Sequence, residues 1–356
     1  MRSSPRLEAY AGEPRTPGRE RWSSVIVRRV RAAGVGRALR KGPHRGKALC
    51  GAAAVLVVAG AGGWLALPGG TEGKEGQGDG LVGAVSLPWP DEGQTSIEVQ
   101  GVGSLGSRGD RRPVPIASVT KVMTAYVILK EHPLAAGEKG PRITVDAAAA
   151  QESHSLSEST VQLREGRRHS QRELLELLLL PSGNNVARLL ARWDAGSQRA
   201  FVAKMNRAAE DLGMTRTTYT GASGFESSTK STADDQLKLA RQAMRQPVLR
   251  EVVALRSTTV PGVPGTVTNT NRLLEKPGVI GLKTGSSTPA GGNLMWAAEA
   301  KSGAGHHLVL GVVLGQRADT TPMEGLEAAI DRSGALIDAV QRRLPGALRA
   351  DKPVRS

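Results

Sequence analysis

Twenty consecutive residues without a charged side chain, 48–67, divide this chain of 356 residues into a short N-terminal part and a long C-terminal part. As an α-helix the run would be about 30 Å long, which is the thickness of the hydrocarbon core of a bilayer. Arg45 and Lys47 precede it, whereas acidic residues follow it. The positive-inside rule therefore predicts a single-pass membrane protein with a cytoplasmic N-terminus and an extracytoplasmic C-terminal part. A cleaved signal peptide is the alternative interpretation of this run.

The positive charge of the chain is concentrated before this run. Residues 1–47 contain 13 Lys and Arg residues and three Glu residues, a balance of +10, so the rest of the chain carries only +5 of the net +15. Because a basic tail beside a membrane anchor is explained by topology, we expect a disordered cytoplasmic tail at 1–47 and no nucleic-acid partner. The single cysteine, Cys50, excludes an internal disulfide framework and a multi-cysteine zinc site.

One folded domain is expected after the anchor. Residues 68–87 begin with a glycine-rich polar stretch and predict a flexible linker. Residues 88–345 carry the apolar patterns of helices and strands and form the predicted catalytic domain, and residues 346–356 form a short basic C-terminal tail.

The patterns within this domain place strands at both ends and helices between them. A strand with a bend is predicted at 95–105, and two buried strands at 293–300 and 308–314. Helices are predicted at 118–130, at 173–180, after Asn185 through Trp193, at 200–212, at 233–244 and at 323–344. This order indicates an α/β (mixed α+β) fold with an antiparallel sheet flanked by helices and a mainly helical lobe.

Ser118 and Lys121 lie three residues apart at the start of the apolar helix, so their side chains share one face. Burial lowers the pKa of a lysine, and a neutral amine beside a serine hydroxyl can act as its general base. The same spacing recurs at Ser227 and Lys230, in a polar stretch that is typical of a loop. Since Ser-x-x-Lys is a common pattern, spacing alone leaves both catalysis and coincidence open.

Two further triplets lie downstream of this pair. Ser182-Gly183-Asn184 follows the helix-ending Pro181, where an irregular turn can direct a hydroxyl and a carboxamide into a cleft. Lys283-Thr284-Gly285 precedes the C-terminal strands. A lysine beside a hydroxyl suits a substrate carboxylate, and the glycine allows close approach of two backbones. His306 and His307 precede a strand without a third ligand, so we expect surface residues there and no metal or other cofactor.

In this order the three motifs resemble those of the serine penicillin-recognising peptidases. Within that superfamily, with its β-lactamase/transpeptidase-like fold, the chain most resembles the low-molecular-mass D-alanyl-D-alanine carboxypeptidases. These penicillin-binding proteins trim the stem peptides of peptidoglycan. The likeness covers residues 88–344 and is clearest at 115–125, 201–220, 269–271 and 281–293. Residues 221–230 depart from the family, because they lack its histidine-glycine pattern.

The resemblance implies a serine-type carboxypeptidase reaction with an acyl-enzyme intermediate. It implies that Ser118 is the acylated nucleophile and that Lys121 is its general base. It further implies that Ser182 relays a proton to the leaving amine and that Asn184 holds the peptide of the substrate. Peptidoglycan stem peptides are then the expected substrates, and β-lactam antibiotics the expected inhibitors.

The substrate-binding residues are implied in the same way. Lys283 and Thr284 would hold the terminal carboxylate, and Gly285 and Ser286 would belong to the same substrate-binding segment. The backbone N–H groups of Ser118 and Ser286 would form the oxyanion hole.

Three alternative functions remain open at this stage. A serine β-lactamase would share the fold, but those enzymes usually have Asp where this chain has Gly183, and no convincing Glu-x-x-x-Asn element lies between Asn184 and Lys283. A D,D-endopeptidase could use the same residues on peptide crosslinks. A non-catalytic membrane protein that binds wall peptides is the third alternative.

Overall fold

The computed structural model describes residues 85–302 and 305–350. All of them belong to the second of two units into which the chain divides, residues 71–356. The predicted cytoplasmic tail, 1–47, and the predicted anchor, 48–67, lie outside the described residues. Within the described part, no helix is both long enough and apolar enough to cross a bilayer.

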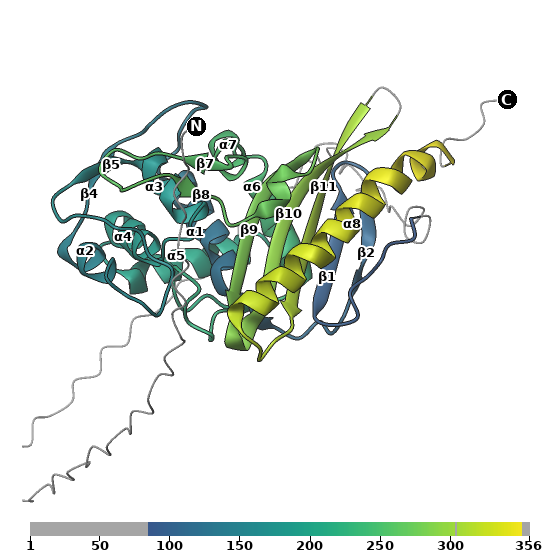
Figure 1. Cartoon of the computed structure of the whole chain (residues 1–356), viewed down its shortest axis with the longest axis horizontal. Helices are drawn as coiled ribbons and strands as arrows, with labels where there is room; N and C mark the ends of the chain where they lie inside the picture. The colour runs from purple at the N-terminus through teal and green to yellow at the C-terminus, as the bar shows by residue number, and fades with distance from the viewer. Residues whose placement is uncertain (1–84, 303–304, 351–356) are drawn as a thin grey trace, which may run out of the picture. The chain divides into compact units, whose positions relative to one another are not determined.

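A five-stranded antiparallel sheet joins the two ends of the folded domain, in the order β2-β1-β11-β10-β9 (Figure 1). Its strands are β1 Gln94–Val99, β2 Gly103–Arg108, β9 Val279–Ser287, β10 Gly291–Ser302 and β11 Gly305–Gln316. The first strand of the domain pairs with the last, and Gln94 lies opposite Leu314. The predicted antiparallel sheet, built from both ends of the domain, is thereby confirmed.

Alternating apolar side chains of β11 enter two separate cores. Leu310, Val312 and Leu314 are buried in the core shared with the helical lobe, whereas Val309 and Val313 are buried in the core on the other face. Successive side chains of a strand point to opposite faces, so a continuous apolar run indicates a strand covered on both sides.

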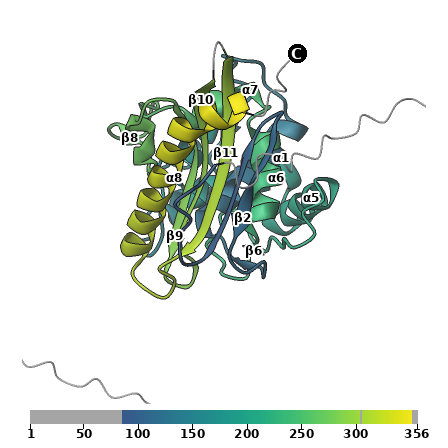
Figure 2. The ribbon, with the colours of Figure 1, turned by 90° about the vertical axis from the view of Figure 1, so that its right-hand side faces the viewer.

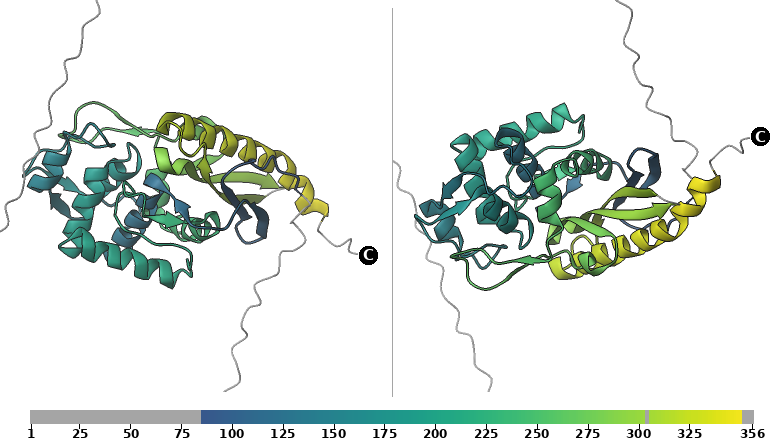
Figure 3. Two further views of the ribbon diagram at one scale, coloured as in Figure 1. Left: turned by 90° about the horizontal axis from the view of Figure 1, so that it is seen from below. Right: turned by 90° about the horizontal axis from the view of Figure 1, so that it is seen from above.

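Helices cover both faces of the sheet (Figure 2). α8 packs on β9, β10 and β11, and α6 packs on β1, β10 and β11 from the opposite side. The other helices gather around α1 in a helical lobe beside the sheet (Figure 1, Figure 3). The helices are α1 Lys121–Glu131, α2 Ala147–Glu152, α3 Gln171–Leu179, α4 Asn184–Ala195, α5 Gln198–Asp211, α6 Ala233–Ala243, α7 Pro247–Val253 and α8 Pro322–Ala350.

Short elements complete the described part of the domain. The 3₁₀ helices are η1 Ala117–Thr120, η2 Arg272–Glu275 and η3 Thr288–Ala290. Paired short strands are β3 Val114–Pro115 with β6 Lys230–Ser231, β4 Arg142–Thr144 with β5 Arg168–Ser170, and β7 Ser257–Thr258 with β8 Val267–Thr268.

Local capping explains where α3 and α4 begin and end. α3 starts two residues before the predicted position, because Ser170 accepts a hydrogen bond from the Glu173 N–H while the Glu173 carboxylate accepts from the Ser170 N–H. This capping box fixes the first turn. α4 ends at Ala195, because the next residue, Gly196, has a φ of 72°, the left-handed conformation that glycine adopts without strain.

Four predicted boundaries are corrected by the structure. Val85 and Leu87, assigned to the linker, are buried in the core beneath α8. The predicted helix at 118–130 begins as the 3₁₀ helix η1 and becomes α-helical only at Lys121. α8 continues through Pro345 to Ala350, because Leu348 and its neighbours extend the apolar stripe of the helix. β11 starts at Gly305, so the two histidines predicted to precede this strand lie within it.

Candidate active site

The predicted nucleophile and its predicted base meet where η1 becomes α1. Ser118 lies in η1 and is half-buried, whereas Lys121 is the first residue of α1 and is fully buried. The Nζ atom of Lys121 lies 2.8 Å from the Oγ atom of Ser118. It also donates hydrogen bonds to Oδ1 of Asn184, at 2.6 Å, and to the backbone oxygen of Ser223, at 2.7 Å.

These contacts suit a neutral lysine. Burial, together with the positive charges of Lys283 and Arg188, holds the pKa of Lys121 well below its ordinary value. A neutral amine has two N–H groups and one lone pair. Because the Asn184 and Ser223 oxygens can only accept, they occupy both N–H groups and leave the lone pair for the Ser118 hydroxyl. The arrangement can therefore remove the hydroxyl proton of Ser118.

The second motif places a buried hydroxyl and a carboxamide in the turn between α3 and α4. Ser182 has a φ of 69°, in the left-handed region that a serine rarely adopts, and its buried Oγ has no hydrogen-bond partner among the described residues. The glycine of the motif is required by space: a Cβ at Gly183 would lie 2.9 Å from the backbone oxygen of Leu177. Asn184 is the first residue of α4 and is buried. An unpartnered buried hydroxyl is available to a bound substrate.

The third motif lies within β9, the edge strand of the sheet. Lys283 and Thr284 are buried, and burial lowers the pKa of Lys283 to about 7. Within the described part of the chain, no carboxylate pairs with this lysine; its Nζ donates to Thr284 Oγ1 at 3.3 Å. A cationic side chain without a carboxylate partner can form an ion pair with the carboxylate of a substrate.

Gly285 brings this strand against the nucleophile. A Cβ at this position would lie 2.8 Å from the backbone nitrogens of both Ser118 and Val119. No other residue type would let β9 approach the start of the helix as closely. The close approach that the sequence predicted for this glycine is thus present, and it sets Ser286, the next residue, at the rim of the site.

One cleft is lined by residues of the first two motifs and by Ser286, the residue that follows the third motif. It has a volume of about 610 Å³, and its lining includes Ser118, Asn184 and Ser286. The remaining lining residues are Leu156, Ser157, Glu158, Ser159, Gly224, Phe225, Ser227, Ser287, Thr288, Pro289 and Pro322. The cleft thus exposes the candidate nucleophile to a ligand.

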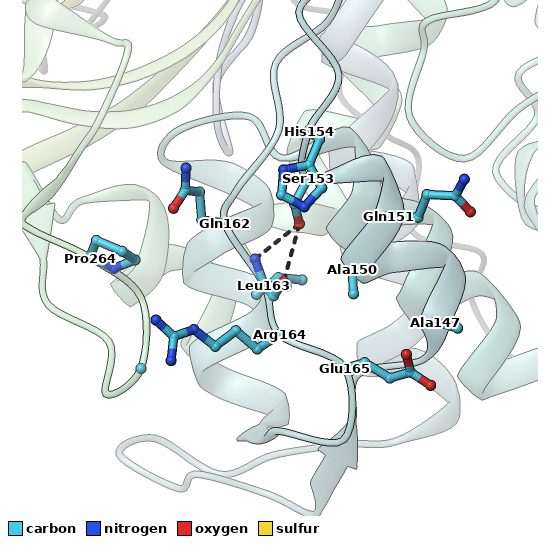
Figure 4. A pocket seen from close by; sticks show the side chains of 11 residues that line it. Ala147, Ala150, Gln151, Ser153, His154, Gln162, Leu163, Arg164, Glu165 and Pro264 are labelled. Carbon is cyan, nitrogen blue, oxygen red and sulfur yellow. Dashed lines mark hydrogen bonds between the residues drawn. The ribbon is translucent and has the colours of Figure 1, made fainter.

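A second cavity, of about 600 Å³, lies between α2, residues 162–165 and Pro264 (Figure 4). None of the predicted site residues lines it. Its wall is held by Ser153, whose Oγ accepts a hydrogen bond from the Leu163 N–H at 3.0 Å, drawn as a dashed line in Figure 4. Ser118 and Asn184 therefore line the first cleft and not this second cavity.

Several residues of the site were not predicted. Glu158 accepts a hydrogen bond from Asn184, and Arg188 donates to Glu158. The backbone oxygen of Ser223 accepts from Lys121. Thr270 lies 2.6 Å from the Thr284 hydroxyl. It belongs to the segment 269–271, whose family likeness was the only sequence signal for any of these residues.

The fold and the cleft together indicate a serine hydrolase. The family described as D-alanyl-D-alanine carboxypeptidase, peptidase family S11, matches residues 102–318. The chain belongs to this family and is a serine hydrolase, as the sequence predicted.

Individual relatives agree with this assignment. The chain is 34% identical over 241 residues to a D-alanyl-D-alanine carboxypeptidase of Mycobacterium tuberculosis, covering 65% of this chain and 78% of the relative. It is 35% identical over 193 residues to a D-alanyl-D-alanine endopeptidase of Pseudomonas aeruginosa, covering 52% and 60% of the two chains. Its fold is similar to that of the Streptomyces K15 DD-transpeptidase, with a TM-score of 0.62, 27% identity, and coverage of 72% of this chain and 98% of that one.

Proposed function

We propose that the protein removes the terminal D-alanine from peptidoglycan stem peptides through an acyl-enzyme on Ser118. The observation that carries this proposal is the position of Lys121, whose Nζ lies 2.8 Å from Ser118 Oγ while its other contacts are made to acceptors. Family membership supplies the substrate class.

Acylation uses the groups of the cleft in sequence. Lys121 takes the proton of the Ser118 hydroxyl, and Oγ attacks the carbonyl carbon of the penultimate D-alanine. The backbone N–H groups of Ser118 and Ser286 donate to the oxyanion of the tetrahedral intermediate. The C–N bond then breaks, and Ser182 passes the proton from Lys121 to the leaving amine. Water hydrolyses the resulting ester, with Lys121 again as base.

Lys283 selects substrates that end in a free carboxylate. Its ammonium form pairs with the terminal carboxylate, and the Thr284 hydroxyl donates a second hydrogen bond. Since burial lowers the pKa of Lys283 to about 7, an incoming anion stabilises the charged form and raises that pKa again. The carboxylate thus supplies the counter-charge that the buried lysine lacks.

Endopeptidase activity on crosslinks is the second candidate. The observation in its favour is the 35% identity to the endopeptidase of Pseudomonas aeruginosa. The same residues would act, but the leaving amine would belong to a neighbouring stem peptide. Release of monomers from crosslinked muropeptides separates this activity from release of free D-alanine.

The site of action proposed for the enzyme is the outer side of the cytoplasmic membrane. The uncharged run at 48–67 serves as the anchor, and the basic residues before it keep the N-terminus in the cytoplasm. Protease accessibility of the domain in intact spheroplasts tests this topology. Protection of the domain would contradict it.

The nucleophile is tested by intact-mass analysis of the full-length protein after brief exposure to penicillin. A stable adduct is expected on the wild type and on Ser227→Ala, and none on Ser118→Ala. Rapid loss of penicillin without an adduct would instead assign a β-lactamase. Neither an adduct nor penicillin loss would favour a non-catalytic protein that binds wall peptides.

A further inference from the structure

A chain of short hydrogen bonds connects the nucleophile to a carboxylate that no motif contains. The Nδ2 group of Asn184 donates to Oε2 of Glu158 at 2.6 Å. On its other side the same carboxamide accepts from Lys121 at 2.6 Å, and Lys121 lies 2.8 Å from Ser118 Oγ. Glu158 thus lies three contacts from the attacking oxygen, in the wall of the same cleft.

Arg188 holds this carboxylate by both oxygens. It lies on α4, four residues after Asn184, and donates to Oε1 of Glu158 at 3.0 Å and to Oε2 at 2.7 Å. The side chains of Glu158 and Arg188 are only 10% and 13% exposed, so solvent screens the pair weakly. Burial alone would raise the pKa of Glu158, but the hydrogen bonds from Arg188 and Asn184 outweigh it and lower this pKa. The carboxylate therefore stays ionised.

An ionised carboxylate can only accept hydrogen bonds, and this property orients Asn184. The amide nitrogen must face Glu158, so the amide oxygen faces Lys121 and takes one of its N–H groups. If the carboxamide turned over, its NH₂ group would donate to the lone pair of Lys121. That lone pair is the one that must receive the proton of Ser118.

The position of Glu158 is itself fixed by the segment that follows it. The Asn184 N–H donates to the backbone oxygen of Ser159 at 2.8 Å. The Val161 N–H donates to the Asn185 side chain at 3.0 Å. Ser153 binds the Leu163 N–H, as Figure 4 shows. Hydrogen bonds of the backbone at 159, 161 and 163 therefore hold the segment after Glu158 against α4 and α2.

We infer that Glu158 and Arg188 are positioning residues for acylation: their ion pair holds the Asn184 carboxamide in the orientation whose oxygen accepts a hydrogen bond from Lys121. The inference rests on the proposed function, because it concerns the proton transfer that forms the acyl-enzyme. It assigns a role to two residues outside the three motifs.

The two charges also act on Lys121 in opposite directions. The negative charge of Glu158 raises the pKa of Lys121, whereas the positive charge of Arg188 lowers it. The other charged groups that face Lys121 are Lys283, which lowers its pKa, and Glu226, which raises it. Removing Glu158 should therefore lower the pKa of Lys121, and removing Arg188 should raise it.

The experiment measures the second-order rate constant for acylation of the full-length protein by penicillin as a function of pH. The acid limb of this profile reports the base of the free enzyme. For Glu158→Gln we expect a rate about tenfold to hundredfold lower, because the orienting bond to a charged group is lost. Its acid limb should move to lower pH. For Arg188→Met the limb should move to higher pH, and Arg188→Lys should restore it toward the wild type.

Asp146→Asn is the matched control. Asp146 forms a bidentate ion pair with Arg192, one turn beyond Arg188 on α4, at 2.6 and 2.9 Å. The variant makes the same change from carboxylate to carboxamide without a contact to Asn184, and asparagine still caps α2. Its acylation profile should match that of the wild type.

Two results would overturn the inference while leaving the proposed function intact. One is an unchanged pH profile in Glu158→Gln, and the other is a shift of the limb in the same direction in both charge-removing variants. A purely structural role would lower the rate and the melting temperature without moving the limb. Failure of the proposed function is distinguishable, because the wild type itself would then form no adduct on Ser118.

Discussion

The chain contains the pattern Ser-x-x-Lys twice, and the two copies lie in different surroundings. At Ser118 the pattern spans the transition from η1 to α1, and its lysine is fully buried 2.8 Å from the serine. Ser227 lies in a loop, as predicted, and both Ser227 and Lys230 are exposed. Lys230 belongs instead to the short strand β6, which pairs with β3. The comparison teaches that burial, rather than spacing, lowers the pKa of a lysine.

The loop that contains Ser227 also contacts the site around Ser118, through residues that precede its own Ser-x-x-Lys pattern. The Ser223 backbone oxygen accepts from Lys121, and the Ala222 backbone oxygen accepts from the Thr124 hydroxyl at 2.6 Å. Gly224 packs on η1, where a Cβ would lie 1.9 Å from the Ala117 oxygen. Residues 222–224, in the stretch that departs from the family pattern, therefore pack against η1 and α1.

The largest effect on the acylation rate is expected when the lysine of each Ser-x-x-Lys pattern is replaced in turn by methionine and the two variants are compared. Lys121→Met should lower the rate of penicillin acylation by about 10²- to 10⁴-fold, because the general base is lost. Lys230→Met should leave the rate within about twofold of the wild type, as for an exposed residue remote from chemistry. Stopped-flow measurement of acylation compares the two variants. A similar loss in both would mean that burial does not distinguish the copies.

The next effect concerns the pH dependence of peptide hydrolysis. Lys283 must be charged to hold the carboxylate, and its pKa in the free enzyme is about 7. The value of kcat/KM for a D-Ala-D-Ala peptide should therefore fall as pH rises through this range. Lys283→Arg stays charged up to pH 12 and should lose this alkaline limb, although its activity is lower overall. If the alkaline limb of kcat/KM is unchanged in Lys283→Arg, a group other than Lys283 causes that limb.

A smaller effect is expected on stability when the wall of the site is altered. Gly224→Ala should lower the free energy of unfolding by about 2–4 kcal/mol, because a strained φ of 78° is joined by the clash with Ala117. Gly213→Ala is the control: it has a φ of 66° but open space around the position, so about 1–2 kcal/mol is expected. Urea titrations measure both. Equal losses would show that Gly224 does not press on η1.

A slope of stability with pH is expected as well. Because the pKa of Lys283 is about 7 in the folded protein and 10.5 is its ordinary value, the unfolded chain binds one more proton between these limits. The free energy of unfolding should thus rise with pH in this window, by about 1.4 kcal/mol per unit for this lysine. Lys283→Met should remove that part of the slope, with Lys230→Met as the control for loss of a positive charge. Identical slopes in all three proteins would contradict the burial of a titrating Lys283.

Much of the fold could be predicted from short-range patterns. The apolar run at 308–314 predicted a buried strand because its side chains enter both cores of the sheet. The apolar stripe along α8 predicted a long helix at 323–344, but Pro345 gave no signal that the helix continues to Ala350. The predicted boundaries were wrong where a helix cap or a core distant in sequence determines them, as at Ser170 and Val85.

The sequence by itself determined the order of the elements, the three motifs and the family, because each depends on neighbouring residues. The tertiary structure alone decided which Ser-x-x-Lys pair is buried, and it brought Glu158 and Arg188 to Asn184. Glu158 reaches Arg188 across 30 residues of chain, and Lys121 reaches Asn184 across 63. Contacts over such separations form only when the elements pack, because burial and electrostatic fields depend on the whole fold rather than on local spacing.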